Sequence, residues 1–174
     1  EAGRYTNNNT NKAACLICAI GTYQGLEGQS DCIECEAGKY SNENTNKTDC
    51  LECQAGRFTN ENTNKVDCTD CSSGEHQPSS ASNRCLECQS GKYQPEVGNA
   101  TCANCEAGRF TNNNTNKVDC TNCASGEYQP GSGSQSCLEC HPGKYQPEQG
   151  SGTCLDCEAG RYTNNNTNKA ACLI

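Results

Sequence analysis

Residues 105–123 read CEAGRFTNNNTNKVDCTNC, a stretch that opens on one cysteine and closes on a Cys-x-x-Cys pair. A Gly-x-aromatic triplet, Gly108 to Phe110, begins after two intervening residues. The same frame recurs along the whole chain, in 17-residue and 18-residue repeats. A fixed short period of this kind predicts a tandem-repeat architecture, in which each repeat packs on its neighbours.

The Cys-x-x-Cys pairs delimit the repeats. They are Cys15/Cys18, Cys32/Cys35, Cys50/Cys53, Cys68/Cys71, Cys85/Cys88, Cys102/Cys105, Cys120/Cys123, Cys137/Cys140 and Cys154/Cys157, and Cys172 begins a tenth. We therefore divide the chain into repeats 1 to 10, the last one partial: residues 1–18, 19–35, 36–53, 54–71, 72–88, 89–105, 106–123, 124–140, 141–157 and 158–174.

A longer period lies on top of the short one. Residues 54–105 and 106–157 match closely as 52-residue super-repeats, each made of one 18-residue repeat and two 17-residue repeats. Residues 1–17 are identical to residues 158–174, and the chain contains no Met. These observations predict an internal segment of a longer periodic array.

Every aromatic residue occupies the same repeat position, two residues after a glycine. They are Tyr5, Tyr23, Tyr40, Phe58, Tyr93, Phe110, Tyr128, Tyr145 and Tyr162. Only repeat 5 departs, with His76 at this position. We expect these rings to be buried and to stack against the neighbouring repeat, and the glycine to supply a positive φ or a close backbone approach.

Cysteine is unusually frequent, with 19 among 174 residues, whereas Trp is absent. Hydrophobic residues make up only 32 % of the chain, and many of them are cysteines. They cannot fill one large core, and we therefore expect many small cores held by disulfides. Disulfides persist in oxidising compartments, which predicts an extracellular or cell-surface location. Segments such as Lys-Tyr-Gln and Arg-Phe-Thr favour very short strands. The predicted fold is a small disulfide-rich tandem repeat, an elongated solenoid-like rod or fibre with short β-strands and turns and almost no helix.

Pairing within a Cys-x-x-Cys is typical of redox sites rather than of architecture. The simplest structural scheme therefore links the second cysteine of one pair to the first of the next: Cys18–Cys32, Cys35–Cys50, Cys53–Cys68, Cys71–Cys85, Cys88–Cys102, Cys105–Cys120, Cys123–Cys137, Cys140–Cys154 and Cys157–Cys172. Cys15 is left over, and its partner would directly precede Glu1, because its counterpart Cys172 bonds Cys157. Sequence alone leaves the connectivity open.

Two Cys-x-x-Cys pairs separated by about 15 residues are also a zinc signature. A four-cysteine site uses two pairs and would give a two-repeat alternation, whereas the observed periods are one repeat and three repeats. Asn-x-Ser/Thr sequons, which are used only in secreted chains, also weigh against zinc. The disulfide interpretation is therefore favoured, and no metal or cofactor is expected.

The net charge of −8 and the interspersed acids and bases argue against nucleic acid as a partner. No apolar run is long enough to span a membrane.

One row of acids lies inside the Cys-x-x-Cys pairs: Glu34, Glu52, Asp70, Glu87, Glu139 and Asp156. A row of bases follows the glycines: Arg4, Lys39, Arg57, Lys92, Arg109, Lys144 and Arg161. Weak solvated ion pairs are the favoured interpretation, with Ca²⁺ on the acidic row as the alternative, although a dedicated calcium-loop pattern is absent.

Five sequons predict N-linked glycans, at Asn8, Asn46, Asn99, Asn113 and Asn165, and Asn83 begins the rarer Asn-Arg-Cys. Several of them recur in one loop of the 18-residue repeat, which favours a solvent-facing turn.

For catalysis the sequence offers nothing: His76 and His141 occur in repeats whose counterparts lack them, without a fixed nucleophile or acid. The chain is therefore predicted not to be an enzyme.

The unit Cys-x-x-Cys-x-x-Gly-x-Tyr, followed by seven or eight residues and the next pair, resembles the ephrin-receptor-like cysteine-rich repeat over all 174 residues. It is also similar to the smallest module of tumour-necrosis-factor-receptor domains, an EGF-like class of small disulfide module. In that module one disulfide closes a Cys-x-x-Gly-x-Tyr loop. The resemblance implies one such loop from Cys123, Gly126, Tyr128 and Cys137, and His76 departs from the pattern.

Long uniform arrays of this kind resemble those of protist surface proteins, including filament and mastigoneme (flagellar-hair) components. We expect a secreted, glycosylated structural protein of an extracellular filament, flagellar hair or stalk, which associates with copies of itself. The alternative is a receptor or adhesion ectodomain, or a protist surface antigen, that binds a protein or glycan. Near-identical repeats without a differentiated patch favour the structural role, because fold alone does not fix function.

Overall fold

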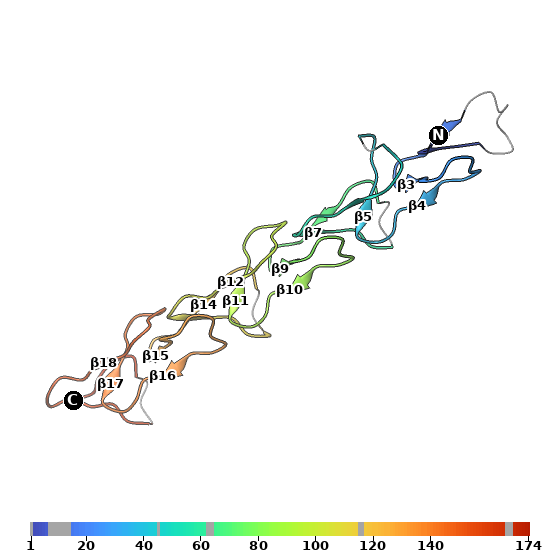
Figure 1. Cartoon of the computed structure of the whole chain (residues 1–174). Coiled ribbons are helices and arrows are strands. Elements are labelled where there is room, and N and C mark those ends of the chain that lie inside the picture. Colours follow the sequence, from blue (N-terminus) through green and yellow to red (C-terminus); the bar gives the residue numbers. More distant parts are fainter. Residues whose placement is uncertain (1, 7–14, 45, 62–64, 115–116, 166–168) are drawn as a thin grey trace. The chain divides into compact units, whose positions relative to one another are not determined.

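The computed structural model describes residues 2–6, 15–44, 46–61, 65–114, 117–165 and 169–174. Within these ranges the chain forms two-residue strands joined by turns, and no helix (Figure 1). The strands pair as two-stranded antiparallel sheets, and each sheet joins two strands that follow one another in the sequence. The predicted class, a small disulfide-rich repeat with short strands, is confirmed.

The strands alternate between the two halves of each hairpin. They are β1 (Arg4–Tyr5), β2 (Leu16–Ile17), β3 (Thr22–Tyr23), β4 (Ile33–Glu34), β5 (Lys39–Tyr40), β6 (Leu51–Glu52), β7 (Arg57–Phe58), β8 (Thr69–Asp70), β9 (Glu75–His76), β10 (Leu86–Glu87), β11 (Lys92–Tyr93), β12 (Ala103–Asn104), β13 (Arg109–Phe110), β14 (Thr121–Asn122), β15 (Glu127–Tyr128), β16 (Leu138–Glu139), β17 (Lys144–Tyr145) and β18 (Leu155–Asp156). An isolated bridge joins Tyr162 and Leu173 at the next equivalent position.

Each hairpin has the same construction. Its first strand is the residue after the glycine together with the aromatic, and its second strand is the two spacer residues of the next Cys-x-x-Cys pair. In β7 and β8, Arg57 lies opposite Asp70 and Phe58 lies opposite Thr69. Aromatic and β-branched residues favour such strands. The second strand thus consists of the two residues between the cysteines of a pair.

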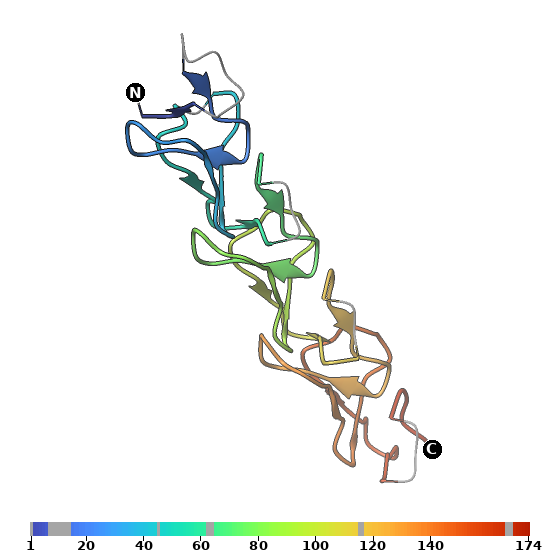
Figure 2. The same ribbon diagram turned by 90° about the vertical axis from the view of Figure 1, so that its right-hand side faces the viewer.

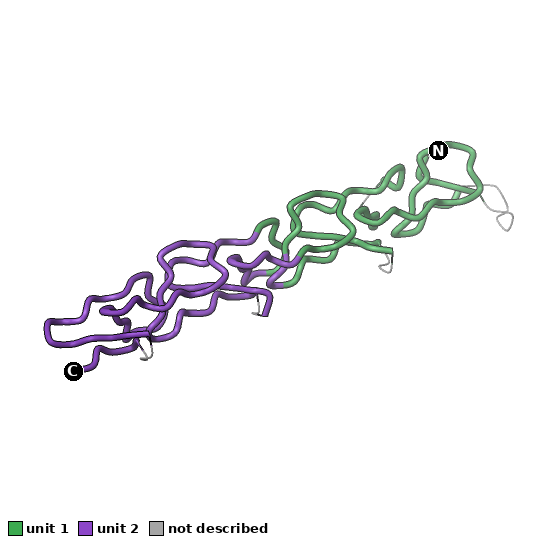
Figure 3. The backbone as a smooth tube through the Cα atoms, turned by 90° about the horizontal axis from the view of Figure 1, so that it is seen from below, with its two compact units in different colours: residues 1–72, 76–86, 97–101 green, residues 73–75, 87–96, 102–174 purple. Residues whose placement is uncertain are grey.

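The chain divides into two compact units, coloured separately in Figure 3. Unit 1 comprises residues 1–72, 76–86 and 97–101, and unit 2 comprises residues 73–75, 87–96 and 102–174. Within each unit the same small hairpin recurs (Figure 2). The contacts described below lie inside one unit or the other.

The buried core consists of cysteines and polar side chains. The second cysteine of most pairs is almost completely buried, as with Cys53, Cys71 and Cys123, each 0 % exposed. The residue after the aromatic is equally enclosed, with Thr59 and Thr111 both 0 % exposed. The core of each unit therefore consists of sulfur and hydrogen-bonded polar groups rather than of hydrocarbon.

The aromatic residues are less buried than the sequence predicts, and their stacking against the neighbouring repeat stays a prediction. The rings of Tyr5, Tyr23, Tyr40, Phe58, Tyr93, Phe110, Tyr128 and Tyr145 are only half-buried, and Tyr162 is exposed. Side chains alternate between the two faces of a strand, so the residue after the aromatic points inward in its place. In the strand register the aromatic residue lies opposite the first spacer of a cysteine pair, as Tyr128 does with Leu138.

Candidate functional site in the contacts between repeats

Backbone hydrogen bonds join each repeat to the next. The N–H of the glycine before each first strand donates to the carbonyl of the buried polar residue in the following repeat, at N···O distances of 2.6–3.1 Å. The nine donors are Gly3, Gly21, Gly38, Gly56, Gly74, Gly91, Gly108, Gly126 and Gly143. The carbonyl of the same glycine accepts from the second cysteine of its own repeat, as with Cys123 N–H and Gly108 O, 2.9 Å. One glycine thus closes its hairpin and binds the next repeat.

A second set of backbone bonds reaches two repeats along the chain. Gly150 N–H donates to Cys123 O, 2.9 Å, and Gly133 N–H donates to Cys105 O, 2.8 Å. Ala81 makes the equivalent bond to Cys53 O, 2.8 Å. These bonds use main-chain atoms only, so they are available to a repeat whatever its surface side chains.

Several turn glycines are in close contact with the repeat two positions later. Gly108 has φ +82°, and a Cβ built on it would lie 1.9 Å from Gly150 O. At Gly56 the corresponding distance is 2.0 Å, to Gly98 O. A side chain at these positions would displace the neighbouring backbone. The expectation that these glycines serve a positive φ or a close approach is met by both features together.

In the 17-residue repeats a buried glutamine organises the loop. Gln129 Nε2 donates to Ser136 O, 2.7 Å, and its Oε1 accepts from Gly131 N–H, 3.1 Å. Gln146 repeats both bonds, to Thr153 O and Glu148 N–H, at 2.7 and 2.9 Å. One amide side chain therefore satisfies two backbone groups that the loop would otherwise leave unpaired.

In the 18-residue repeats the buried polar side chains that bond to the backbone are a threonine or serine and a lysine. Thr111 Oγ1 donates to Lys92 O in the preceding repeat, 3.0 Å. Thr59 and Ser41 do the same to Lys39 O and Thr22 O, at 3.0 and 2.9 Å. These repeats also bury a lysine that is 4–6 % exposed, in the set Lys47, Lys65, Lys117 and Lys169.

Two of these buried lysines form ion pairs across two repeats. Lys117 Nζ lies 3.6 Å from Glu87 Oε1, and Lys169 Nζ lies 3.2 Å from Glu139 Oε2. In both pairs the glutamate is the second spacer of a cysteine pair and lies two repeats before the lysine. The exposed acidic position is thus a partner of two of the four buried lysines. Lys65 pairs instead with Glu61 of its own repeat, at 3.3 Å.

Lys47 has no such partner among the described residues, because Ile17 occupies the equivalent position two repeats earlier. Its Nζ donates instead to Asn42 O, 2.6 Å. Burial lowers the pKa of Lys47 below its usual range, and the charge of Glu43 only partly opposes this effect. Keeping the ammonium group of Lys47 charged in the folded chain therefore costs free energy.

The predicted rows of charge face each other across the hairpins. Arg57 Nε lies 2.7 Å from Asp70 Oδ1, and Lys144 Nζ lies 2.6 Å from Asp156 Oδ1. These acids are therefore engaged by bases of the same hairpin. Calcium on the acidic row stays a prediction.

A second acidic position precedes the first cysteine of several pairs. Asp119 Oδ1 accepts from Cys120 N–H, 2.7 Å, and both carboxylate oxygens lie 3.1 Å from Arg109 Nη2. The backbone N–H of Cys120 and then the Arg109 guanidinium lower the pKa of Asp119. Arg109 also donates to Cys120 O, so one arginine fastens the start of the pair.

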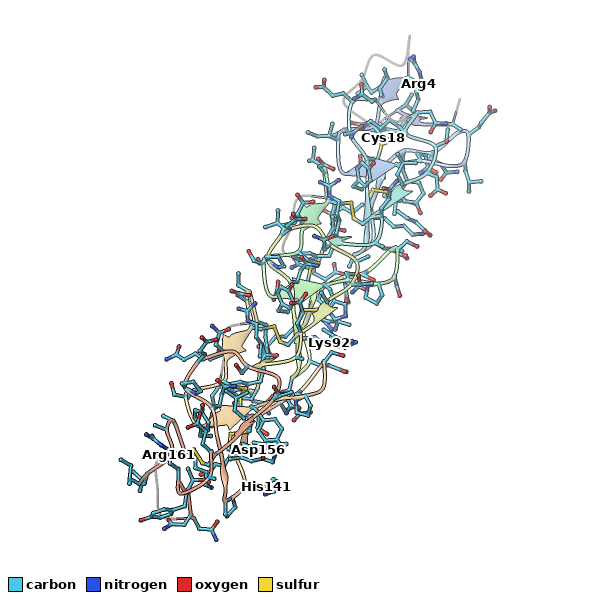
Figure 4. The ribbon with its side chains drawn as sticks, turned by 90° about the vertical axis from the view of Figure 1, so that its left-hand side faces the viewer. Arg4, Cys18, Lys92, His141, Asp156 and Arg161 are labelled. Carbon is cyan, nitrogen blue, oxygen red and sulfur yellow. A yellow bond between two sulfur atoms is a disulfide. The ribbon has the colours of Figure 1, made fainter. Side chains whose placement is uncertain are left out.

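The structure joins each second cysteine to the first cysteine of the next pair. The disulfides are Cys18–Cys32, Cys35–Cys50, Cys53–Cys68, Cys71–Cys85, Cys88–Cys102, Cys105–Cys120, Cys123–Cys137, Cys140–Cys154 and Cys157–Cys172, with Cα atoms 5.6–5.9 Å apart. Figure 4 shows sulfur–sulfur bonds of this kind in yellow within the ribbon, near Cys18 for example. Cys15 is exposed and free. Each disulfide closes a ring that spans two adjacent repeats.

The predicted glycan acceptors differ in exposure. Asn46, Asn113 and Asn165 are exposed and Asn99 is half-buried, while Asn8 lies outside the described residues. The two histidines belong to different repeats and do not form a common site: His141 is exposed, and His76 Nδ1 lies 3.1 Å from Leu86 O in its own hairpin.

Sequence reasoning missed the buried polar residues. Gln follows the aromatic in the 17-residue repeats, Ser or Thr follows it in the 18-residue repeats, and Lys stands three residues before a cysteine only in the latter. That covariation with repeat length was the available signal. It was obscured because Lys and Gln are usually exposed.

Comparison with known proteins agrees with this geometry. The model of a family described as tyrosine-protein kinase ephrin type A/B receptor-like matches residues 3–43, 78–115 and 131–172. The chain belongs to this family. The three matched segments of the ephrin-receptor-like chain cover most of its length, and each includes at least one complete disulfide ring. Comparison with curated proteins finds no significant match.

Membership fixes the general setting of the protein. Ephrin-receptor-like repeats are non-catalytic modules of extracellular domains, and the many disulfides likewise indicate an extracellular or surface location. In the described part of the chain, no helix is long and apolar enough to cross a membrane.

Proposed function

We propose that this ephrin-receptor-like chain is a structural component of an extracellular filament, flagellar hair or stalk, glycosylated and self-associating. The observation that carries the proposal is the set of backbone bonds made by the nine turn glycines. They recur at equivalent positions in repeats that differ on their surfaces. Such contacts add repeats one after another without requiring any particular side chain, as in other repeat proteins.

The surface chemistry supports the same role. Leu or Ile is the first spacer of many cysteine pairs and stays exposed, as with Leu51, 51 %, and Leu138, 47 %. Each is accompanied by a half-buried ring on the adjacent strand. A regular series of small apolar positions, each bordered by charges, suits weak lateral contacts repeated many times rather than one strong binding patch.

Negative-stain electron microscopy and sedimentation of the secreted, disulfide-intact protein test the proposal. We expect concentration-dependent association, ending in filaments or fibres with an axial repeat related to the repeat length. A strictly monomeric protein at all concentrations, both as purified and in extracts of the native surface, would contradict it.

A second candidate, a receptor or adhesion ectodomain, is favoured by two small clefts at equivalent positions. One, of about 220 Å³, is lined by Tyr128, His141 and Lys144 among others. The other, of about 270 Å³, lies one repeat further on and is lined by Tyr145, Glu158 and Arg161 among others. Saturable binding of a glycan or protein, lost on truncating Tyr128 to Ala, would favour this candidate over a structural role.

A further inference from the structure

The sequon Asn46-Lys47-Thr48 forms a pre-arranged turn. Asn46 is exposed, and its Oδ1 accepts from Thr48 Oγ1 at 2.8 Å and from Thr48 N–H at 3.3 Å. No described residue forms a hydrogen bond with Asn46 Nδ2, the atom to which an N-linked sugar is attached. The acceptor amide is therefore held through its oxygen while its nitrogen faces solvent.

The residue between them explains this orientation. Lys47 has φ +60° and is 5 % exposed, with its Nζ bonded to Asn42 O. The backbone of Asn46 also faces inward, since its carbonyl oxygen lies 2.7 Å from the Cβ position of Gly3. With Lys47 anchored in the interior, the Asn46 and Thr48 side chains meet on the outer side of the turn.

Asn99 heads the other sequon whose three residues are all described, and it has a different environment. It is half-buried, and its carbonyl accepts from Gln77 N–H at 3.2 Å. Its backbone is pressed against repeat 4, where a Cβ on Gly56 would lie 3.2 Å from Asn99 C. Neither Asn99 nor Thr101 is without partners. Because Asn99 is half-buried and its backbone is held against repeat 4, its side chain has less room for a bulky sugar than that of exposed Asn46.

We infer that Asn46 carries an N-linked glycan in the folded protein and that Asn99 does not. The inference rests on the proposed secretion of the chain and names which acceptor is used. In the transfer, a bond forms between Asn46 Nδ2 and C1 of an N-acetylhexosamine at the end of a lipid-diphosphate-linked oligosaccharide. The C1–O bond to the diphosphate breaks, the diphosphate leaves with the electron pair, and Nδ2 loses one proton.

The test is expression of the whole chain behind a secretory leader in glycosylating eukaryotic cells. Secreted and cell-associated protein are both treated with an N-glycosidase in ¹⁸O-water, so that each formerly glycosylated Asn becomes labelled Asp. We expect the label at Asn46 and unlabelled Asn at Asn99. Thr48→Ala should abolish the label at Asn46, and Thr48→Ser, which keeps the hydroxyl, should retain it.

Asn99→Gln is the matched control and should leave the glycan mass unchanged. An unlabelled Asn46 in folded protein, or a label at Asn99 equal to that at Asn46, would overturn the inference. Microscopy of the same secreted protein separates this inference from the proposed function. Filaments formed by protein whose Asn46 is unlabelled would overturn only this inference, and labelled Asn46 without filaments would overturn only the structural role.

Discussion

Replacing Gly108 by Ala tests the contact between a turn glycine and the repeat two positions later. At φ +82°, an alanine has an intrinsic cost of about 1–2 kcal/mol. The added Cβ would also lie 1.9 Å from Gly150 O, so the backbone of repeat 9 must move. Overpacking of this kind costs about 1–3 kcal/mol. We expect Gly108→Ala to lower the free energy of unfolding by about 2–5 kcal/mol.

Gly143→Ala is the matched control. Gly143 has nearly the same φ, +80°, and no described atom lies within 4 Å of its Cβ position. Only the conformational cost applies, so the expected loss is about 1–2 kcal/mol. The difference between the two variants isolates the contact between repeats.

Urea unfolding of the disulfide-intact variants measures the difference, and amide hydrogen exchange locates it. In Gly108→Ala the Gly150 amide, which donates to Cys123 O, should exchange faster than in the parent chain. In Gly143→Ala it should be unchanged. Equal losses of stability in both variants, with Gly150 protected in each, would refute the reasoning.

Three further predictions concern charge. Glu87→Gln removes the partner of buried Lys117 and should lower the free energy of unfolding by at most about 1 kcal/mol, since Glu87 is largely exposed. An unchanged urea midpoint would mean that the ion pair does not stabilise the fold. Ile17→Glu places a carboxylate two repeats before Lys47, at the position that Glu87 and Glu139 occupy in the two ion pairs found. It should raise the lowered pKa of Lys47, which NMR titration measures. An unaltered titration of Lys47 would show that an acid at this position does not reach its ammonium group. Because the pKa of Asp119 is lowered in the folded chain, its carboxylate stabilises the fold. Its contribution to the free energy of unfolding is complete above about pH 4, and it is lost as the pH falls through the lowered pKa of the folded state. Asp119→Asn should therefore flatten the acid decline in stability, and an unchanged pH profile would contradict this.

The repeat frame and the short strand at the Gly-x-aromatic position were predictable because covalent and local constraints set them. The spacing of the cysteine pairs gives the repeat length, and segments such as Arg-Phe-Thr favour a short strand, whereas the second strand of each hairpin was not predicted. These features depend on residues close together in the sequence. The burial of individual side chains depends on packing between repeats, and there prediction failed.

Tyr128 and Gln129 illustrate the failure. Apolarity favours Tyr128 as the core residue, yet Tyr128 is half-buried and Gln129 is buried at 9 % exposure. A loop of this length exposes more backbone donors and acceptors than its own turns satisfy, so the inward position selects a side chain that bonds Ser136 O and Gly131 N–H. Lys117 follows the same logic, with a partner two repeats away that no local pattern indicates.

The central claim is that disulfides join adjacent repeats, and peptide mapping of unreduced protein tests it most directly. Cleavage after glutamate separates the two cysteines of several pairs, because Glu34 and Glu52 lie between them. The dipeptide 35–36 should then be recovered linked to peptide 44–52, which contains Cys50. Recovery of that dipeptide linked to peptide 53–61, or alkylated as a free thiol in the native protein, would contradict the account.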